Sequence, residues 1–145
     1  MISIEYPSVN FKIREQNGYE EIWDAIRRKW VKLTPEEWVR QNFLNYLTIV
    51  KQYPASLIAI EKEVQLLELK KRCDIVLYKD EQPWMIVECK ALNVQLSEQT
   101  VEQILRYNLS IPVPFLIITN GNTTFGWERK NGNLLKIHAL PGYQE

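Results

Sequence analysis

Arg72-Cys73-Asp74-Ile75-Val76-Leu77-Tyr78 and, a short polar turn later, Trp84-Met85-Ile86-Val87-Glu88-Cys89-Lys90 predict two neighbouring β-strands. The second stretch ends with an acidic and a basic side chain on one face and a cysteine on the other, because alternate side chains of a strand share a face. Asp74, on the same face as Val76, joins the acidic and basic pair if the two strands form a hairpin. Two carboxylates and an ammonium on one sheet face cost free energy unless a ligand uses them. We expect that ligand to be a divalent metal ion.

A helix is predicted ahead of these strands. Thr34 supplies a capping hydroxyl, Pro35 occupies the first helical position, and Glu37 stands three residues after the cap, as in a capping box. Apolar residues then recur at helical spacing as far as about Lys51. The dipeptide Tyr53-Pro54 ends this helix, because a residue before proline is disfavoured in helical conformation.

The remaining elements complete a mixed α/β pattern. They are a strand at 57–61, a helix capped by Ser97 and running to about Leu109, an apolar strand at 115–119, and a terminal hairpin formed by 123–128 and 134–137. The order is therefore helix, three strands, helix and strand, followed by the hairpin. This order predicts a mixed central sheet flanked by helices.

The chain has 145 residues and shows no internal repeat, low-complexity run or linker, so we expect a single domain spanning 1–145. Residues 34–121 are the predicted core, 1–33 an N-terminal arm, and 122–145 the C-terminal hairpin. Within the arm, the alternating pattern of 9–13 favours an edge strand or an extended arm. The segment 21–31 fits either a second short strand or an irregular wrap, and the sequence leaves that choice open.

Composition and charge narrow the class of protein. Eighteen basic and eighteen acidic residues cancel, which counts against a dedicated high-affinity DNA-binding protein but not against an enzyme whose local groups meet a phosphate. No stretch approaches the length of a membrane span, and residues 1–10 lack the features of a signal peptide, so we expect a cytoplasmic location. Cys73 and Cys89 are too few for a disulfide framework or a zinc site, and we expect both to be buried away from the site.

Asp74 with the Glu88-Cys89-Lys90 triplet resembles the D…E-x-K signature of the PD-(D/E)xK nuclease superfamily, whose core has the element order predicted above. Cys73 stands where the signature proline would precede the first acid. Gln103 and Tyr107, on the second predicted helix, resemble the Q-x-x-x-Y pattern found in several branches of that superfamily.

A narrower resemblance begins at Pro35-Glu36-Glu37-Trp38-Val39-Arg40-Gln41. Together with the strands and the second helix, it is similar to the N-terminal nuclease domain of type I restriction enzyme R subunits, over roughly 33–121. The resemblance implies a restriction-endonuclease-like α/β core. Since no P-loop or helicase motif follows, we expect a standalone relative rather than the large translocating subunit.

The resemblance also implies roles for the triplet. Asp74 and Glu88 would hold Mg²⁺, with Mn²⁺ as a substitute, and the backbone carbonyl of Cys89 would add a ligand. The metal would polarise the scissile phosphate and lower the pKa of the attacking water. Lys90 would orient or activate that water, or balance charge in the transition state.

Further site residues are expected on the two helices. Glu37 would add an acid to the site, but it can instead complete the capping box, in which case Glu36 is the inward acid. Gln103 would hydrogen-bond a water at the metal or a phosphate, and Tyr107 would contact phosphate or simply pack. The basic candidates for phosphate contact are Arg40, Lys71, Arg72 and Arg106.

The leading hypothesis is a Mg²⁺-dependent endonuclease that hydrolyses DNA phosphodiester bonds, as a homodimer or together with a helicase, translocase or specificity partner. The alternative is a non-catalytic nucleic-acid-binding or assembly module on the same fold. Neutral net charge favours the alternative, whereas the intact set of Asp74, Glu88 and Lys90 favours the enzyme. A junction resolvase shares the core but would need a broad basic surface, which the sequence does not show.

Overall fold

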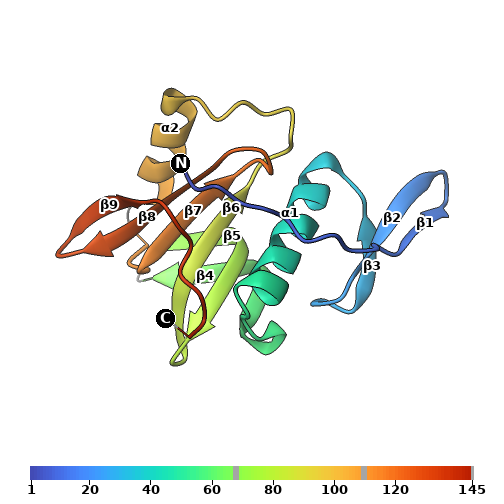
Figure 1. The fold of residues 1–145 in the computed structure, drawn as a ribbon, viewed down its shortest axis with the longest axis horizontal. Coiled ribbons are helices and arrows are strands. Elements are labelled where there is room, and N and C mark those ends of the chain that lie inside the picture. Colours follow the sequence, from blue (N-terminus) through green and yellow to red (C-terminus); the bar gives the residue numbers. More distant parts are fainter. Residues whose placement is uncertain (67–68, 109–110, 145) are drawn as a thin grey trace.

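Two β-sheets and two α-helices make up the chain in the computed structural model, which describes residues 1–66, 69–108 and 111–144 (Figure 1). The smaller sheet has three antiparallel strands: β1 (Ile13–Gln16), β2 (Tyr19–Asp24) and β3 (Lys29–Lys32). The larger sheet has six strands, in the order β4 (Ile58–Leu66), β5 (Leu69–Lys79), β6 (Gln82–Cys89), β7 (Phe115–Thr119), β8 (Thr124–Lys130) and β9 (Asn133–Ile137). The helices are α1 (Pro35–Asn45) and α2 (Glu98–Asn108).

The larger sheet is mixed because β6 and β7 run parallel while the other neighbouring strands are antiparallel. The parallel pair is joined by the crossover through α2, as parallel strands require a long connection. The polar turn after β5 and the hairpin formed by β8 and β9 lie where the sequence predicts them. The predicted end of the second helix, at Leu109, lies outside the described residues.

Helix α1 begins as its sequence predicts. The hydroxyl of Thr34 accepts a hydrogen bond of 3.0 Å from the backbone N–H of Glu37, with Pro35 at the first helical position. A π-helical turn (Tyr46–Val50) follows directly, which extends the helical stretch to the predicted length. A short 3₁₀ turn (Ala55–Leu57) then leads into β4. No helix among the described residues has the length and apolar character that crossing a membrane requires.

Alternation along β6 builds the core on both faces of the larger sheet. Met85 and Val87 pack in a buried cluster with Phe43 of α1, whereas Ile86 lies in a separate cluster on the opposite face. Val101 of α2 packs in a third cluster with residues of the last strands. The two helices therefore cover opposite faces, and this is the restriction-endonuclease-like α/β architecture that the sequence predicts.

The structure of the smaller sheet decides whether residues 21–31 form a strand or an irregular wrap. Residues 21–31 form the hairpin of β2 and β3, in which Trp23 pairs with Trp30. Of the two alternatives for 9–13, the structure shows the arm rather than the edge strand, because β1 starts only at the last residue of that segment. The turn Asn17-Gly18, with φ angles of 54° and 84°, sets this register, since left-handed residues match the twist of a two-residue hairpin.

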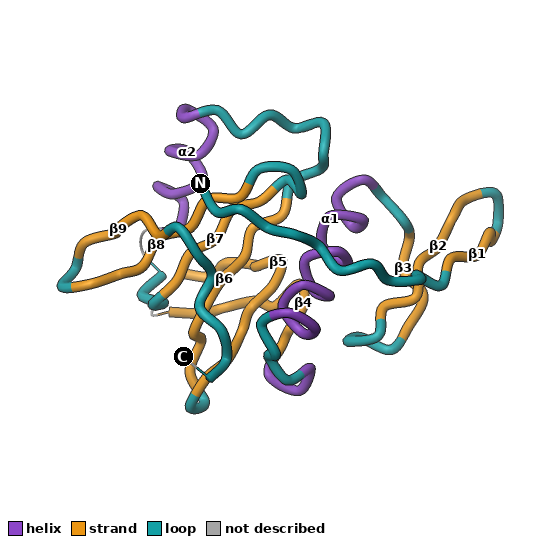
Figure 2. The backbone as a smooth tube through the Cα atoms, viewed as in Figure 1, coloured by secondary structure: helices purple, strands orange, loops and turns teal. Residues whose placement is uncertain are grey.

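The N-terminal segment connects the two sheets a second time. Figure 2 shows it crossing α1 between the larger sheet and β1. At one end, Ile2 forms a bridge with Thr124 of β8, with an N···O distance of 2.8 Å. Near the other end, the ring of Phe11 packs against Trp38 of α1 at 4.9 Å between centroids. The smaller sheet is thus attached mainly to α1, with an ion pair from Arg27 to Glu61 on the edge strand β4 at 3.7 Å.

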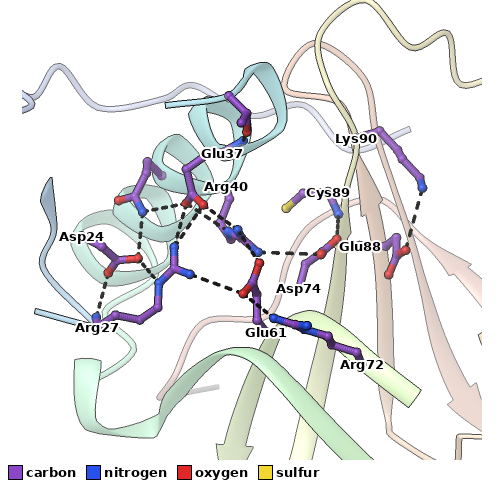
Figure 3. A network of polar contacts seen from close by, with 12 residues as sticks. Asp24, Arg27, Glu37, Arg40, Glu61, Arg72, Asp74, Glu88, Cys89 and Lys90 are labelled. Carbon is purple, nitrogen blue, oxygen red and sulfur yellow. Dashed lines mark hydrogen bonds and ion pairs between the residues drawn. The ribbon is translucent and has the colours of Figure 1, made fainter. Parts of the chain in front are cut away.

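A buried charge network fixes that attachment (Figure 3). Asp24, at the end of β2, is fully buried and accepts hydrogen bonds from Arg27 Nε at 2.6 Å and Gln41 Nε2 at 3.0 Å. Arg27 also donates to both carboxylate oxygens of Glu37, at 3.1 Å each. Glu37 in turn accepts from Arg40 Nη2 at 2.6 Å. Each buried charge is therefore neutralised by a hydrogen-bonded partner of opposite sign.

The pKa of Glu37 reports the strength of this pairing. Burial alone would raise it, but the hydrogen bonds from Arg40 and Gln41 and the charge of Arg27 outweigh burial and lower it. Glu37 therefore stays ionised in the folded protein, and the network needs all of its members.

Replacing Arg27 with Met should lower the free energy of unfolding by about 3 kcal/mol, because it leaves buried carboxylates short of a partner. The matched control is Arg14→Met, which removes a surface ion pair with Glu21 and the contact of the guanidinium with the Trp30 ring, and should cost about 1 kcal/mol. Urea denaturation followed by circular dichroism measures both changes. Equal losses in the two variants would show that the buried network does not stabilise the fold.

Candidate active site

The pairing between β5 and β6 stops where the candidate site begins. The antiparallel register runs as far as Ile75 opposite Val87, which would bring Asp74 opposite Glu88 as the next pair. Instead, the Asp74 carboxylate accepts a hydrogen bond of 2.7 Å from the backbone N–H of Cys89. The side chain of Asp74 thus takes the place of a backbone acceptor and holds the end of β6 against β5.

The predicted shared face of Asp74 and Val76 is wrong. Cys73 and Val76 lie in the same apolar cluster, so the alternation of side chains is interrupted between them. On the neighbouring strand β4, Glu61 has a φ of 52°, and its pairing with Asp74 is missing although the register is the same on both sides. This irregularity turns Asp74 toward α1, where its carboxylate lies 3.8 Å from Arg40 Nη1.

Glu88 and Lys90 share a face at the end of β6, as alternation predicts. Lys90 Nζ lies 4.0 Å from Glu88 Oε1. The backbone N–H of Lys90 donates to the carbonyl of Thr119 on β7 at 2.8 Å, which fixes the chain just beyond the strand. The Lys90 side chain is about one-third exposed, so it can reach a ligand that arrives from solvent.

Glu88 carries an oxygen that the protein does not satisfy. Its Oε2 is buried and accepts no hydrogen bond from any described residue. The nearest cation is the buried Lys71, whose Nζ lies 3.9 Å away and also contacts the Oδ1 atom of Asn108 on α2. Burial raises the pKa of Glu88, and the negative charge of Asp74 raises it further. The two carboxylates are therefore close enough to repel one another.

The two acids at the start of α1 take different positions. Glu37 is held in the buried network by Arg27 and Arg40. Glu36 is exposed, and its pKa is raised first by partial burial and then by the charge of Asp74, with Lys90 acting in the opposite direction. Of the two helix acids, Glu36 is thus the one that interacts electrostatically with Asp74 and Lys90.

These residues fit a magnesium ion in one specific sense. Mg²⁺ binds through one or two carboxylates and completes its coordination with water and substrate oxygens. Asp74 and Glu88 supply two such carboxylates, and the unsatisfied Glu88 Oε2 is a buried acceptor that a cation would satisfy. No three His, Cys, Asp or Glu side chains of the described residues gather into a ready-made metal cage. The carbonyl of Cys89 as a further ligand stays a prediction.

Both cysteine side chains are buried in apolar clusters, as expected. Burial raises the pKa of the Cys73 thiol to about 11 and that of Cys89 well above its usual range. Neither thiol is therefore a nucleophile at neutral pH.

The basic residues predicted to contact phosphate occupy very different surroundings. Arg40 and Lys71 are buried against carboxylates, whereas Arg72 is exposed and pairs with Glu61 at 2.6 Å. Arg106 is exposed on α2. Gln103 is also exposed on α2, and within the described residues it forms no hydrogen bond with the site carboxylates. The side chain of Tyr107 lies outside the described residues.

Several residues near the site carried no sequence signal. Arg27 and Asp24 reach the site only through the packing of the smaller sheet on α1, and Asn108 only through Lys71. Glu61 lay inside the predicted strand 57–61, but its ion pairs with Arg40 and Arg72 accompany a left-handed backbone conformation that the alternation of a strand does not predict.

Comparison with known proteins agrees with this arrangement. A profile of the family described as type I restriction enzyme R protein N terminus matches residues 35–141, which cover α1 and the whole larger sheet. No curated protein and no solved structure matches the chain. On the strength of the family match, the chain belongs to the family of type I restriction enzyme R protein N termini.

Proposed function

We propose that this chain is a metal-dependent endonuclease that hydrolyses DNA phosphodiester bonds. Family membership supports a nuclease domain related to restriction enzymes. The observation that carries the proposal further is the buried, unsatisfied Oε2 of Glu88 beside Asp74 and Lys90. A purely structural pair of strands would gain from satisfying that oxygen, whereas a metal site needs it available.

The chemistry follows from the positions of the side chains. Asp74 and Glu88 would hold Mg²⁺, which when bound supplies Lewis-acid activation of a scissile phosphate. The backbone N–H of Cys89 holds the Asp74 carboxylate in a fixed orientation before a metal arrives. The Lys90 ammonium, fixed at its backbone by Thr119, would orient the attacking water or stabilise negative charge developing on the phosphate.

The charges of this chain also bear on how it meets DNA. The net charge is zero, and two of the predicted phosphate-binding cations are engaged by buried carboxylates. Family membership implies DNA and other subunits as partners in general. We therefore propose that a second copy of this chain or a DNA-translocating or specificity subunit delivers the substrate, in the cytoplasm. The alternative function is a non-catalytic module that binds nucleic acid or helps to assemble such a complex without cleaving DNA.

Pure protein should nick supercoiled plasmid in the presence of Mg²⁺ or Mn²⁺, and the nicking should stop when EDTA is added. Lys90→Ala should lower the rate roughly 100-fold or more, since it removes a charge that acts on the transition state. Agarose gel electrophoresis measures the loss of supercoiled DNA, and Lys130→Ala, a change in a surface ion pair of β8, is the control. Equal rates for Lys90→Ala and the wild type would remove Lys90 from the proposed site.

Mn²⁺ should raise the melting temperature of the wild type by several degrees, because an ion that binds only the folded state stabilises it by mass action. Glu88→Gln should abolish this rise, whereas Glu128→Gln, a change in the half-buried partner of Lys130 on β8, should retain it. Differential scanning calorimetry with and without the metal checks both variants. A rise that survives in Glu88→Gln would mean that the ion binds elsewhere.

The adjacent variants Glu36→Gln and Glu37→Gln should separate the two helix acids. Glu36→Gln should slow cleavage about tenfold with little change in stability, because its carboxylate acts on the site from an exposed position. Glu37→Gln should lower the free energy of unfolding by about 3 kcal/mol, since it breaks the buried network. Plasmid nicking and urea denaturation of each variant test this. A stable, inactive Glu37→Gln beside an active Glu36→Gln would reverse the assignment.

A further inference from the structure

An open groove of about 640 Å³ separates the smaller sheet from the larger one. Strand β3 forms one wall, from Lys29 to Lys32, and the start of α1 lies beside it. Glu61 and Ala91 line the opposite side, and Ala91 directly follows Lys90. The groove therefore runs from the outer edge of the smaller sheet to the candidate active site.

The groove wall made by β3 is a free sheet edge. In the three-stranded sheet β3 pairs only with β2, so its other edge faces the groove. An edge strand in a soluble protein needs protection against pairing with another chain, and lysines commonly provide it. Lys29 and Lys32 do so here, but their charges also make this edge attractive to an anion.

The basic residues that line the groove differ in whether a carboxylate already pairs with them. Arg27 and Arg40 line it, but both are hydrogen-bonded to Glu37. Lys29 and Lys32, in contrast, form no ion pair with any described carboxylate, and Lys32 Nζ lies 5.4 Å from the ring centre of Tyr19. The two lysines are thus the cations that remain for a ligand of the groove.

Aromatic rings accompany these cations. Trp30 also lines the groove, and its ring lies on the sheet face that it shares with Lys32, where it packs edge-on against Trp23 at 5.5 Å and carries the Arg14 guanidinium 4.3 Å above it, whereas Lys29 lies on the opposite face. Tyr19, on the same sheet, is about 40% exposed. Aromatic rings interleaved with basic side chains are the features by which proteins bind unpaired nucleotides, through base stacking and phosphate contact.

We propose that this groove binds a single-stranded segment of DNA and leads it to the Asp74, Glu88 and Lys90 site. Lys29 and Lys32 contact backbone phosphates, and Trp30 stacks on a base. The direction toward the site follows from two residues that line the groove. Ala91 directly follows Lys90, and Glu36 interacts electrostatically with Asp74 and Lys90. This inference rests on the proposed nuclease function for its biological purpose, but the binding itself requires no metal.

Fluorescence anisotropy of a short labelled oligothymidylate in EDTA tests the binding without cleavage. The double variant Lys29→Ala with Lys32→Ala should bind at least tenfold more weakly than the wild type, and the slope of its affinity against salt should fall by about 1.4. The charge-matched control is Lys130→Ala with Lys136→Ala, on the hairpin of β8 and β9, which should bind as the wild type does. Circular dichroism melts establish that each variant is folded.

The aromatic part of the proposal has its own pair of variants. Trp30→Leu should weaken binding about tenfold, since stacking on one base is lost, while Trp30→Phe should retain most of the affinity. A duplex of the same sequence should bind more weakly than the single strand. Tighter binding of the duplex together with an unchanged affinity of Trp30→Leu would overturn the single-strand assignment.

Two results would overturn the groove as a binding site: no oligonucleotide binding by the wild type, or equal affinities of the two double lysine variants. Cleavage of plasmid is measured separately with Mg²⁺. Binding that depends on Lys29 and Lys32, in a protein that never cleaves, would leave the groove standing and refute the nuclease. Cleavage with binding independent of these lysines would do the reverse.

Discussion

The ion pair between Glu37 and Arg40 is the interaction on which the other parts of the structure depend. Both side chains are buried, and Arg40 is also shared with Glu61 on β4 and with Asp74 on β5. Arg27 brings the smaller sheet to the same point. Because an unpaired buried charge is so costly, these contacts can only form together. The guanidinium groups of Arg40 and Arg27, which meet at Glu37, therefore set the relative positions of α1, the smaller sheet and the first acid of the candidate site.

Local rules predicted most of the fold, because most of its elements follow from local physics. The cap at Thr34, the alternation along β6 and the element order needed only neighbouring residues. The Asn17-Gly18 turn was also a local signal, and reading it would have placed β1 correctly. The irregular backbone at Glu61, opposite Asp74, was different. This irregularity arises where two strands and a helix meet, and the sequence of neither strand predicts it.

In the candidate site, too, the sequence alone does not show which charged side chains face a ligand. Glu36 and Glu37 are adjacent, so any pattern that places one near the site also admits the other, and only the rotation of α1 separates them. Arg40 and Lys71 are residue types that commonly bind phosphate, yet each also has a partner from a distant segment of the chain, Glu61 for Arg40 and Asn108 for Lys71. Sequence identifies which side chains carry charge; tertiary packing decides which charges remain free for a ligand.

The neutral net charge of the chain therefore has a structural explanation: several of the basic residues near the site pair with buried acidic ones. Much of the basic complement near the site neutralises buried carboxylates, and those pairs order the site rather than attract a polyanion. Under the proposed function, the cations that remain for the substrate are local: Lys90 at the end of β6, and the lysines along the free edge of β3. A protein built in this way gains little long-range steering and depends on contacts close to the reacting phosphate. An enzyme whose substrate is brought to it by a larger assembly can work under that constraint, because delivery raises the local concentration that electrostatic attraction would otherwise have to supply.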